Sequence, residues 1–397
     1  MLKQIGLMFG ALLLAACGGG GGGSKLPAVP SSQALSSSAG SSLLPASSSL
    51  MPLSSSSSSV SLSSSSSFPT SSTAFALGAD LGWVTEMEDN NKKFYNAQSE
   101  QKDAFELTQS LGIDAIRLRV WVSPANKYNT IQDVVAKALR AKALGQRVMI
   151  NFHYSDIWAD PGKQFKPEAW SKYSFEELKT ALATHTRNSL IALRDAGVEP
   201  EWVQVGNETN DGFLWDTARP SVEPKNANMK NYAELTTAGY DAVKEIFPTA
   251  KVIVHLSNCH DNANFRWIFD GLTANNAKFD VIGASSYPTR SATETNSTWQ
   301  TITQNCLANL NDMVSRYQRP VVLAEIGVPW DHPEGKAIVA DLISKARAVD
   351  GGKGLGVFYW EPLAYDWNGY SLGAFDLTGK PTTIMDAFSE AAASLPK

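Results

Sequence analysis

Two glutamates stand out as candidates for chemistry, because each directly follows an apolar run. Glu208 ends the run that begins at Trp202, and Glu325 ends the run that begins at Val321. Short apolar runs of this kind are typical of buried β-strands, so each carboxyl group would lie at a strand end. Cleavage of a glycosidic bond needs two such groups, one to protonate the leaving oxygen and one to attack or to activate water. The sequence therefore predicts that Glu208 and Glu325 form a catalytic carboxylate pair.

The elements that must position this pair are short β-rich runs that alternate with amphipathic helical stretches. The strand candidates are residues 76–83, 115–121, 148–154, 202–208, 251–257, 280–287, 320–326 and 356–361. Helical patterns between them include residues 100–111, 131–144, 175–196, 232–247 and 334–349. Eight βα units predict an α/β protein of the (β/α)8 TIM-barrel type. A doubly wound open sheet is the alternative, but the glycine-rich phosphate loop expected after its first strand is not found in the sequence.

A TIM barrel places its chemistry at the C-terminal ends of its strands. In this sequence those ends carry many charged and aromatic residues: Asp80, Trp83, Arg117, Arg119, Trp121, His153, Tyr154, Asn207, Glu208, His255, Asn258, Tyr287, Glu325, Trp360 and Glu361. The fourth and seventh strands face each other across the barrel mouth, so both glutamates can reach one bond. We expect Arg117 and Tyr287 to favour the ionised form of Glu325, which suits a nucleophile.

The second glutamate has the opposite requirement. Glu208 must stay protonated to act as an acid, and must then serve as a base once the leaving group has departed. We expect Asn207 to donate a hydrogen bond to the 2-hydroxyl of the sugar. His153 and His255 are either donors to the substrate or hydrogen-bonded residues that line the mouth.

Several motifs resemble those of glycoside hydrolase family 53. They are residues 78–88, 116–121, 151–161, 205–208 and 358–362, and the string His-Tyr-Ser-Asp-Ile-Trp-Ala-Asp-Pro at 153–161 is the most specific of them. The similarity runs from residue 76 to about residue 394. The resemblance implies an endo-acting β-1,4-galactanase that degrades galactan side chains of pectin and type I arabinogalactan by a retaining mechanism.

The resemblance also implies roles for individual residues. By position, Glu208 is the acid/base and Glu325 is the nucleophile, as the strand-end argument also predicts. Residues implied to surround the sugar at the cleavage point are Asp80, Arg117, His153, Asn207 and Tyr287, with Trp360 stacked beneath it. Some family members hold a structural calcium near the last loops. Asp331 and Asp366 occur there without a compact oxygen-ligand loop, so we expect neither a metal nor a cofactor.

The N-terminal part of the chain reads as an export and tethering segment. Lys3 precedes an apolar run at residues 5–16 that is too short to span a bilayer, and residues 14–17 resemble a bacterial lipobox ending in Cys17. We expect a signal peptide at 1–16, a Gly/Ser-rich linker at 17–73 and a catalytic domain at 74–397. The protein is then secreted or anchored to the outer membrane by a lipid on Cys17. An ordinary signal peptide with a chance cysteine is the alternative.

The composition narrows the class of partner. The formal net charge is −5 and no basic patch is apparent, so no nucleic acid is expected. Eleven tryptophans suit stacking on sugar faces, although most are expected to pack within the barrel. Cys259 and Cys306 either pair in an oxidising compartment or remain two free buried thiols. Nothing indicates an obligate oligomer, so we expect a monomer.

Two alternative functions remain open from the sequence. The same carboxylate pair serves enzymes that act on mannan, xylan or another β-1,4-glycan, and the motif at 153–161 argues against these substrates. A non-catalytic lipoprotein that binds polysaccharide is a different class of function. The loss of Glu208 or Glu325 would be its mark, and both residues are present.

Overall fold

A computed structural model describes residues 75–394 of the chain. The predicted signal peptide, the predicted linker and Cys17 lie outside the described residues. The described residues belong to the segment predicted to be the catalytic domain.

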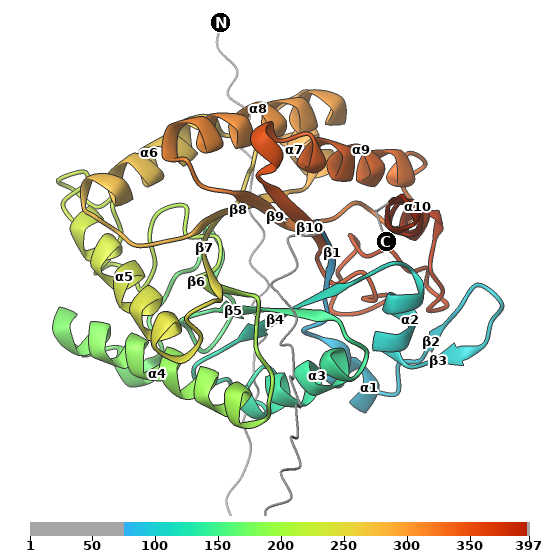
Figure 1. Cartoon of the computed structure of the whole chain (residues 1–397), viewed down its shortest axis with the longest axis horizontal. Helices are drawn as coiled ribbons and strands as arrows, with labels where there is room; N and C mark the ends of the chain where they lie inside the picture. The colour runs from blue at the N-terminus through green and yellow to red at the C-terminus, as the bar shows by residue number, and fades with distance from the viewer. Residues whose placement is uncertain (1–74, 395–397) are drawn as a thin grey trace, which may run out of the picture. The chain divides into compact units, whose positions relative to one another are not determined.

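Eight parallel strands close into a barrel, which confirms the predicted fold (Figure 1). The barrel strands are β1 (Ala76–Asp80), β4 (Ala115–Val120), β5 (Arg147–Phe152), β6 (Trp202–Val205), β7 (Lys251–Leu256), β8 (Val281–Ser286), β9 (Val321–Ile326) and β10 (Gly354–Tyr359). Their order around the ring is β1-β10-β9-β8-β7-β6-β5-β4. All eight predicted runs contain a strand. The predicted strand 202–208 ends early, at Val205, because Gly206 and Glu208 have φ angles of 91° and 45° that leave the strand conformation.

Helices surround this ring on its outside (Figure 1). They are α1 (Val84–Asp89), α2 (Ala104–Ser110), α3 (Ile131–Ala143), α4 (Phe175–Asp195), α5 (Met229–Ile246), α6 (Asn262–Ala274), α7 (Pro288–Glu294), α8 (Trp299–Tyr317), α9 (Gly335–Arg347) and α10 (Asp386–Ala393). Short 3₁₀ turns lie at Glu168–Trp170, Asp350–Gly352 and Thr383–Met385. The helical stripes pack on the outer faces of the strands and form the larger of the two apolar cores.

One predicted helix begins later than the sequence pattern indicated. The pattern placed a helix at 100–111, but Gln101–Lys102 (β3) pairs with Phe94–Tyr95 (β2) in a small hairpin. The helix then begins after Asp103, whose side chain accepts hydrogen bonds from the backbone amides of Phe105 and Glu106. An aspartate at this position satisfies amides that would otherwise lack a partner, and so fixes where the helix starts.

Inside the barrel, the side chains change from apolar to polar along each strand. We call the apolar group at the N-terminal ends the floor layer: Ala76, Ala115, Met149, Trp202, Ile253, Val281, Val322, Ala324 and Phe358. Side chains of a strand alternate between its two faces, so the next inward positions lie two residues further on. On four neighbouring strands these positions are Arg117, Asn151, Gln204 and His255, all of them buried. Polar groups thus fill the barrel above the floor layer.

A bulge in β9 sets the direction of Glu325. Along β8, Ala284 pairs with Leu323 and the next residue, Ser285, pairs with Glu325, so Ala324 is an extra residue. The pairing of β9 with β10 shows a shift at the same place, between Leu323 and Ile326. Bulges change which way the following side chain points. Here Ala324 belongs to the floor layer, and Glu325 also faces the interior.

The two cysteines of this region form a disulfide. Cys259 follows β7 and Cys306 lies in α8, with a separation of 47 positions in sequence and 4.8 Å between their Cα atoms. Of the two alternatives that the sequence left open, the structure shows the paired one. Closing a loop of this length contributes roughly 4 kcal/mol in the chain-entropy model.

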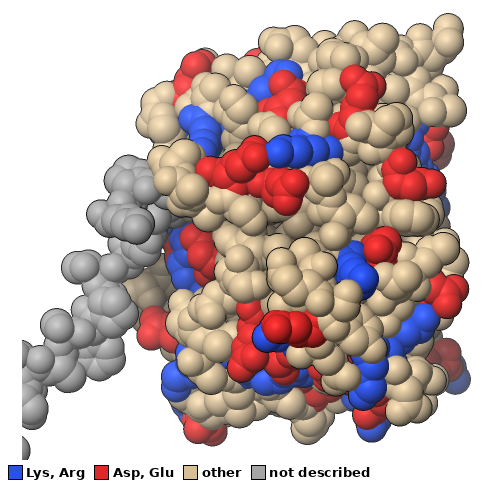
Figure 2. All heavy atoms as spheres, turned by 90° about the vertical axis from the view of Figure 1, so that its right-hand side faces the viewer, with Lys and Arg blue, Asp and Glu red and all other residues tan. Residues whose placement is uncertain are grey.

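The outer surface shown in Figure 2 has acidic and basic side chains interspersed, as the mild net charge leads one to expect. Many of them pair across neighbouring elements, for example Lys336 with Glu390, at 2.6 Å. Within residues 75–394, none of the helices is long and apolar enough to cross a membrane.

Candidate active site

A cavity of about 590 Å³ opens at the C-terminal ends of the strands. Its wall is formed by His153, Trp158, Ala159, Asp160, Pro161, Gly162, Asn207, Glu208, Ser257, Asn258, Tyr287, Arg290, Ser291, Glu294, Glu325, Trp360, Tyr370 and Leu372. Both candidate glutamates therefore face one cavity, although each is almost fully buried from bulk solvent. A partly enclosed polar cavity that holds two carboxyl groups is a site where one bond can be approached from two sides.

Glu325 is held by two donors. Arg117 places Nη2 2.9 Å from Glu325 Oε1, and the Tyr287 hydroxyl donates to Oε2 at 2.8 Å. Burial raises the pKa of Glu325, while the charge of Arg117 and the hydrogen bonds from Tyr287 and Arg117 oppose that rise. Both donors bind the ionised carboxylate best, because each offers a hydrogen to an oxygen lone pair.

Arg117 is itself fixed in place beneath the cavity. Its guanidinium donates to Asp80 Oδ2 and to Asn207 Oδ1, each at 2.8 Å, and to Gln204 Oε1. Arg117 and Asp80 are both fully buried and do not line the cavity wall. Their carboxylate–guanidinium pairing fixes the direction from which Arg117 approaches Glu325.

Glu208 has different surroundings. The hydroxyl of Ser285 lies 2.7 Å from Glu208 Oε1, and Arg117 acts on Glu208 through its charge alone. Burial, together with the negative charge of Glu325, raises the pKa of Glu208 to about 8. A carboxyl group with this pKa keeps its proton at neutral pH. The two carboxyl groups are therefore unlike: at Glu208 burial and a like charge raise the pKa to about 8, whereas at Glu325 the donors Arg117 and Tyr287 oppose the rise that burial causes.

The backbone at Glu208 adopts a left-handed conformation with φ of 45°. The side chain of Gln164 donates to the backbone carbonyl of Glu208 at 3.2 Å and to that of Asn207 at 2.7 Å. Left-handed backbone at a residue with a Cβ costs free energy, and it persists where surrounding contacts hold it. The loop that follows β5 provides that contact through Gln164.

Asn207 presents a hydrogen-bond donor to the cavity, and His153 lines it. Asn207 Nδ2 donates to the carbonyl of Ala159 at 2.8 Å, which leaves its second amide hydrogen for a ligand. Burial and the charges of Arg117 and Arg119 hold the pKa of His153 well below its usual value, so the ring is neutral. The amide of Ala159 donates to His153 Nδ1 at 3.1 Å, and His153 Nε2 lies 3.0 Å from Asn151 Nδ2.

Aromatic rings form one side of the cavity. Trp158, Trp360 and Tyr370 line it, and Trp83 packs behind them with its ring centre 5.0 Å from that of Trp360. The rings meet edge to face, an arrangement that fixes their orientation. The guanidinium of Arg119 lies 4.5 Å from the centre of the Trp158 ring and pairs with Glu361. A fixed aromatic wall of this kind suits the apolar face of a sugar ring.

The structure brings most of the predicted site residues together. His153, Asn207, Glu208, Tyr287, Glu325 and Trp360 line the cavity, whereas Asp80 and Arg117 lie below it and contact its residues. The sequence argument missed Ser285 and Tyr370. Ser285 precedes Tyr287 by two residues, so strand alternation applied to β8 would have placed it on the inner face. Tyr370 lies in the loop after β10, where no strand pattern applies.

Asp331 and Asp366 occur in the loops where some family members hold a structural metal. The carboxylate of Asp366 pairs with Lys92 Nζ at 3.0 Å. Over residues 75–394, no group of three or more His, Cys, Asp or Glu side chains is arranged to hold a metal ion.

Comparisons with known proteins agree on one family. The model of glycosyl hydrolase family 53 matches residues 76–337. An arabinogalactan endo-beta-1,4-galactanase of Cellvibrio japonicus is 32% identical, over 73% of this chain and 81% of its own. An endo-beta-1,4-galactanase of Bacillus subtilis is 31% identical, over 72% of this chain and 70% of its own. The solved family 53 catalytic domain of Ignisphaera aggregans superposes with a TM-score of 0.71 at 27% identity, over 81% of this chain and 97% of that domain.

Proposed function

The chain belongs to glycosyl hydrolase family 53 and is a glycoside hydrolase, and from this premise we propose that it cuts β-1,4-galactan chains internally with Glu325 as nucleophile and Glu208 as acid/base. The observation that carries the assignment is the difference between the two carboxyl groups. Arg117 and Tyr287 contact Glu325 as donors and favour its ionised form, while burial and the charge of Glu325 keep the proton on Glu208. A retaining mechanism requires this difference.

In the first step, a carboxylate oxygen of Glu325 attacks the anomeric carbon and the bond to the leaving oxygen breaks. Glu208 gives its proton to that oxygen, so the leaving chain departs as a neutral alcohol. The second amide hydrogen of Asn207 is free to bind the 2-hydroxyl, where hydrogen bonds strengthen as the ring flattens. The product of this step is a glycosyl ester on Glu325.

In the second step, a water molecule takes the place of the leaving chain. Glu208 is now ionised, and it removes a proton from this water as the oxygen attacks the anomeric carbon. The ester bond to Glu325 breaks, and Arg117 and Tyr287 receive the carboxylate that is released. Each glutamate returns to its starting protonation state, and the configuration at the anomeric carbon is retained.

The substrate is assigned from the relatives together with the cavity. The two relatives described above are named as galactanases. The cavity offers a donor from Asn207 and the polar ring of His153 beside an aromatic wall, as a sugar with several hydroxyls requires. Mannan and xylan remain the alternative substrates, since the carboxylate pair would serve them equally. Galactan side chains of pectin would be the natural source of the proposed substrate.

We place the enzyme outside the cytoplasm, as a secreted protein or one held at the outer membrane by a lipid on Cys17. The disulfide between Cys259 and Cys306 supports this location, because disulfides persist in oxidising compartments. Replacing Cys17 by alanine should release the protein from the membrane fraction of the producing cells. An unchanged distribution between the membrane and the soluble fractions would contradict lipid anchoring.

The first experiment is to supply the purified protein with β-1,4-galactan, β-mannan and xylan side by side and to resolve the released sugars by size. Short galacto-oligosaccharides from galactan alone would support both the substrate and the internal cutting mode. Release from mannan or xylan instead would keep the glutamate pair and change the substrate. Galactose as the only early product would contradict internal cutting.

A further inference from the structure

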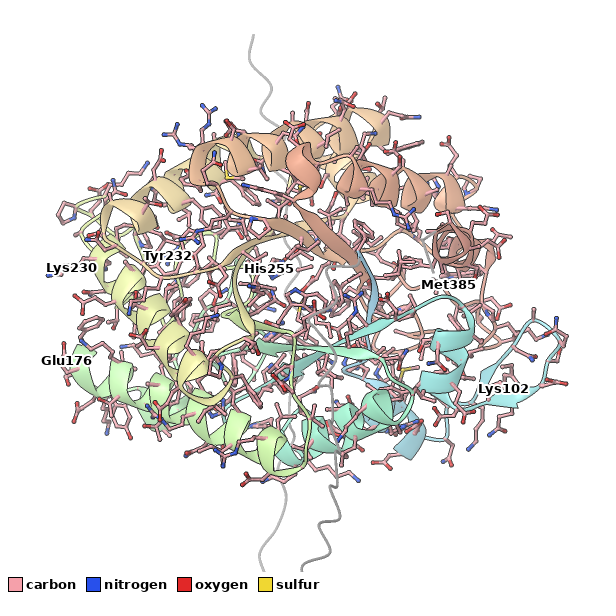
Figure 3. All side chains as sticks on the ribbon, viewed as in Figure 1. Lys102, Glu176, Lys230, Tyr232, His255 and Met385 are labelled. Atoms are coloured by element: carbon pink, nitrogen blue, oxygen red, sulfur yellow. A yellow bond between two sulfur atoms is a disulfide. The ribbon has the colours of Figure 1, made fainter. Side chains whose placement is uncertain are left out.

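A chain of hydrogen bonds leads from Glu208 into the barrel wall. Ser285 Oγ lies 2.7 Å from Glu208 Oε1 and 2.8 Å from His255 Nε2, and His255 Nδ1 lies 3.2 Å from Asn207 Oδ1. Ser285 and His255 are both fully buried, and Figure 3 places His255 inside the ring of strands. Neither residue lines the cavity, so neither is available to bind substrate. Their contacts point instead to an effect on Glu208.

The far end of this chain has a fixed polarity. Asn207 Oδ1 accepts a hydrogen bond from Arg117, a side chain that has no lone pair to offer. Asn207 Nδ2 donates to the carbonyl of Ala159, which has no hydrogen to offer. Turning the amide over would set donor against donor and acceptor against acceptor. Asn207 therefore presents an acceptor oxygen to His255.

This polarity selects the form of His255. Burial and the charge of Arg117 hold the pKa of His255 well below its usual value, so the ring is neutral and carries one hydrogen. An unprotonated Nδ1 would set its lone pair against Asn207 Oδ1 at 3.2 Å. The hydrogen is therefore on Nδ1, and Nε2 is an acceptor.

The polarity then passes to the serine and to the acid. Nε2 of His255 must accept a hydrogen bond, and within this row of hydrogen-bonded side chains the hydroxyl of Ser285 is the neighbour that can donate it. A hydroxyl has a single hydrogen, so Ser285 then faces Glu208 with a lone pair. We propose that Ser285 and His255 are positioning residues. Their hydrogen bonds are all satisfied only when Glu208 is protonated, and they thereby keep the proton on the acid/base in the resting enzyme. The proposal rests on the role of Glu208 proposed above.

The chain also bears on the second step of the reaction. Once Glu208 has given its proton to the leaving oxygen, Ser285 can turn its hydrogen toward the carboxylate. His255 Nε2 then faces a lone pair of Ser285. If Ser285 instead keeps its hydrogen on His255, the Glu208 carboxylate faces that lone pair. Either arrangement leaves one buried contact unpaired, which is unfavourable. The ionised Glu208 is thereby made a stronger base for the proton of the incoming water.

Other charged and titratable groups also act on Glu208. They are Glu325 on β9, Arg117 on β4, Asp160 after β5, and Tyr287 and Arg290 at the start of α7. The chain through Ser285 is distinct from these groups because it contains no charge. Changes confined to Ser285 and His255 therefore leave the charges around Glu208 unaltered.

A direct test measures the hydrogen position on His255 without any substrate. The protein labelled with ¹⁵N at histidine is studied by NMR at about pH 6, below the pKa of about 8 for Glu208, and His255→Gln assigns the resonances. We expect a protonated Nδ1 and an unprotonated Nε2. A hydrogen on Nε2, or on both nitrogens, would overturn the proposal whatever the substrate proves to be.

A second test uses the pH dependence of kcat/KM on galactan. In Ser285→Ala the protonated form of Glu208 loses its acceptor. In His255→Gln the new amide can supply a hydrogen to Ser285, which frees Ser285 to donate to the ionised form. Both variants should move the alkaline limb of the profile to lower pH by about one unit, which is about a tenfold loss of activity above that limb. A shift to higher pH in Ser285→Ala would mean that Ser285 serves only as a donor to the carboxylate.

The matched control is His185→Gln. His185 is a half-buried histidine of α4 that packs against Phe152 and Trp170, outside the site. The His185→Gln variant should leave both limbs of the pH profile of kcat/KM in place. General damage to the barrel would instead lower the rates of all three variants alike. An aryl galactoside with an activated leaving group needs no acid in the first step, so pre-steady-state release of its phenol should be nearly unchanged in Ser285→Ala. A wild type inactive on galactan would contradict the proposed substrate, while the NMR result would still decide the proposal.

Discussion

The floor layer and the cavity are built on the same eight strands, yet they have opposite properties. Across the floor layer, Trp202 and Phe358 meet edge to face at 5.9 Å within a wholly apolar group. A few residues further along the same strands, Glu208 and Glu361 are buried carboxyl groups whose pKa values are each raised to about 8. Burial of the floor layer stabilises the folded protein, whereas burial of the polar groups at the cavity costs stability because water would solvate them better.

This contrast shows where the barrel has been shaped for stability and where for chemistry. Apolar burial at the floor layer needs no particular partner, only volume. Each charged group around the cavity needs a specific partner, as Arg117 has in Asp80 and Arg119 has in Glu361. A substitution in the floor layer should therefore change stability with little effect on chemistry, and a substitution at the cavity should do the reverse.

The largest effect is expected at Glu325. Glu325→Ala removes the proposed nucleophile, and Glu325→Gln keeps its shape without a nucleophilic carboxylate. Both should lower kcat on galactan by at least about 10⁴-fold, since no other group can form the glycosyl ester. Reducing-sugar assays give the rates, and binding of galacto-oligosaccharide by calorimetry should remain measurable. A rate within tenfold of the wild type in either variant would remove Glu325 from the mechanism.

A smaller effect is expected at Glu208, because general acid catalysis contributes about 10²- to 10⁴-fold. Glu208→Ala should lower the rate on galactan by that factor. It should leave the first step of cleavage of an activated aryl galactoside nearly intact, which pre-steady-state release of the phenol would measure. Equal losses on both substrates would indicate that Glu208 acts on binding and not as an acid.

At the floor layer, Trp202→Ala should destabilise the protein by about 3–5 kcal/mol through a buried cavity. The folded fraction should keep kcat/KM within a few-fold of the wild type, because Trp202 is absent from the wall of the active-site cavity. Urea unfolding gives the free energy, and Trp202→Phe is the control, with a smaller loss. A variant of normal stability and poor activity would contradict the division between the two regions.

The division itself could be predicted in part from the sequence. Apolar runs bounded by turn residues identified all eight strands, and the polar residues at their ends identified Glu208, Glu325 and six of their neighbours. What the sequence argument did not predict depends on how strands align. The extra residue at Ala324 turns Glu325 inward, and a bulge of this kind carries no mark in an otherwise regular run such as Val321–Ile326.

The link between Glu208 and His255 could not be predicted from the sequence for a similar reason. It runs through Ser285, and it exists because β6, β7 and β8 align so that three side chains from different strands meet. Serine is too common in strands to indicate a role by its type. The roles of Asp80 and Arg117 as buried supports, and not as cavity lining, also depend on the depth of each inward position, which residue type does not reveal.

A last effect is expected on how stability changes with pH, and it separates the two regions most sharply. Burial is the main cause that raises the pKa values of Glu208 and Glu361 from 4.5 to about 8, so the folded protein binds more protons than the unfolded chain between these pH values. Stability should therefore fall as pH rises through this window. Unfolding in urea at pH 5 and pH 8 measures the change. Glu208→Gln and Glu361→Gln should each reduce the slope, whereas Trp202→Phe should lower stability equally at both pH values. A wild type that gains stability over this window would mean that both carboxyl groups are ionised in the folded protein.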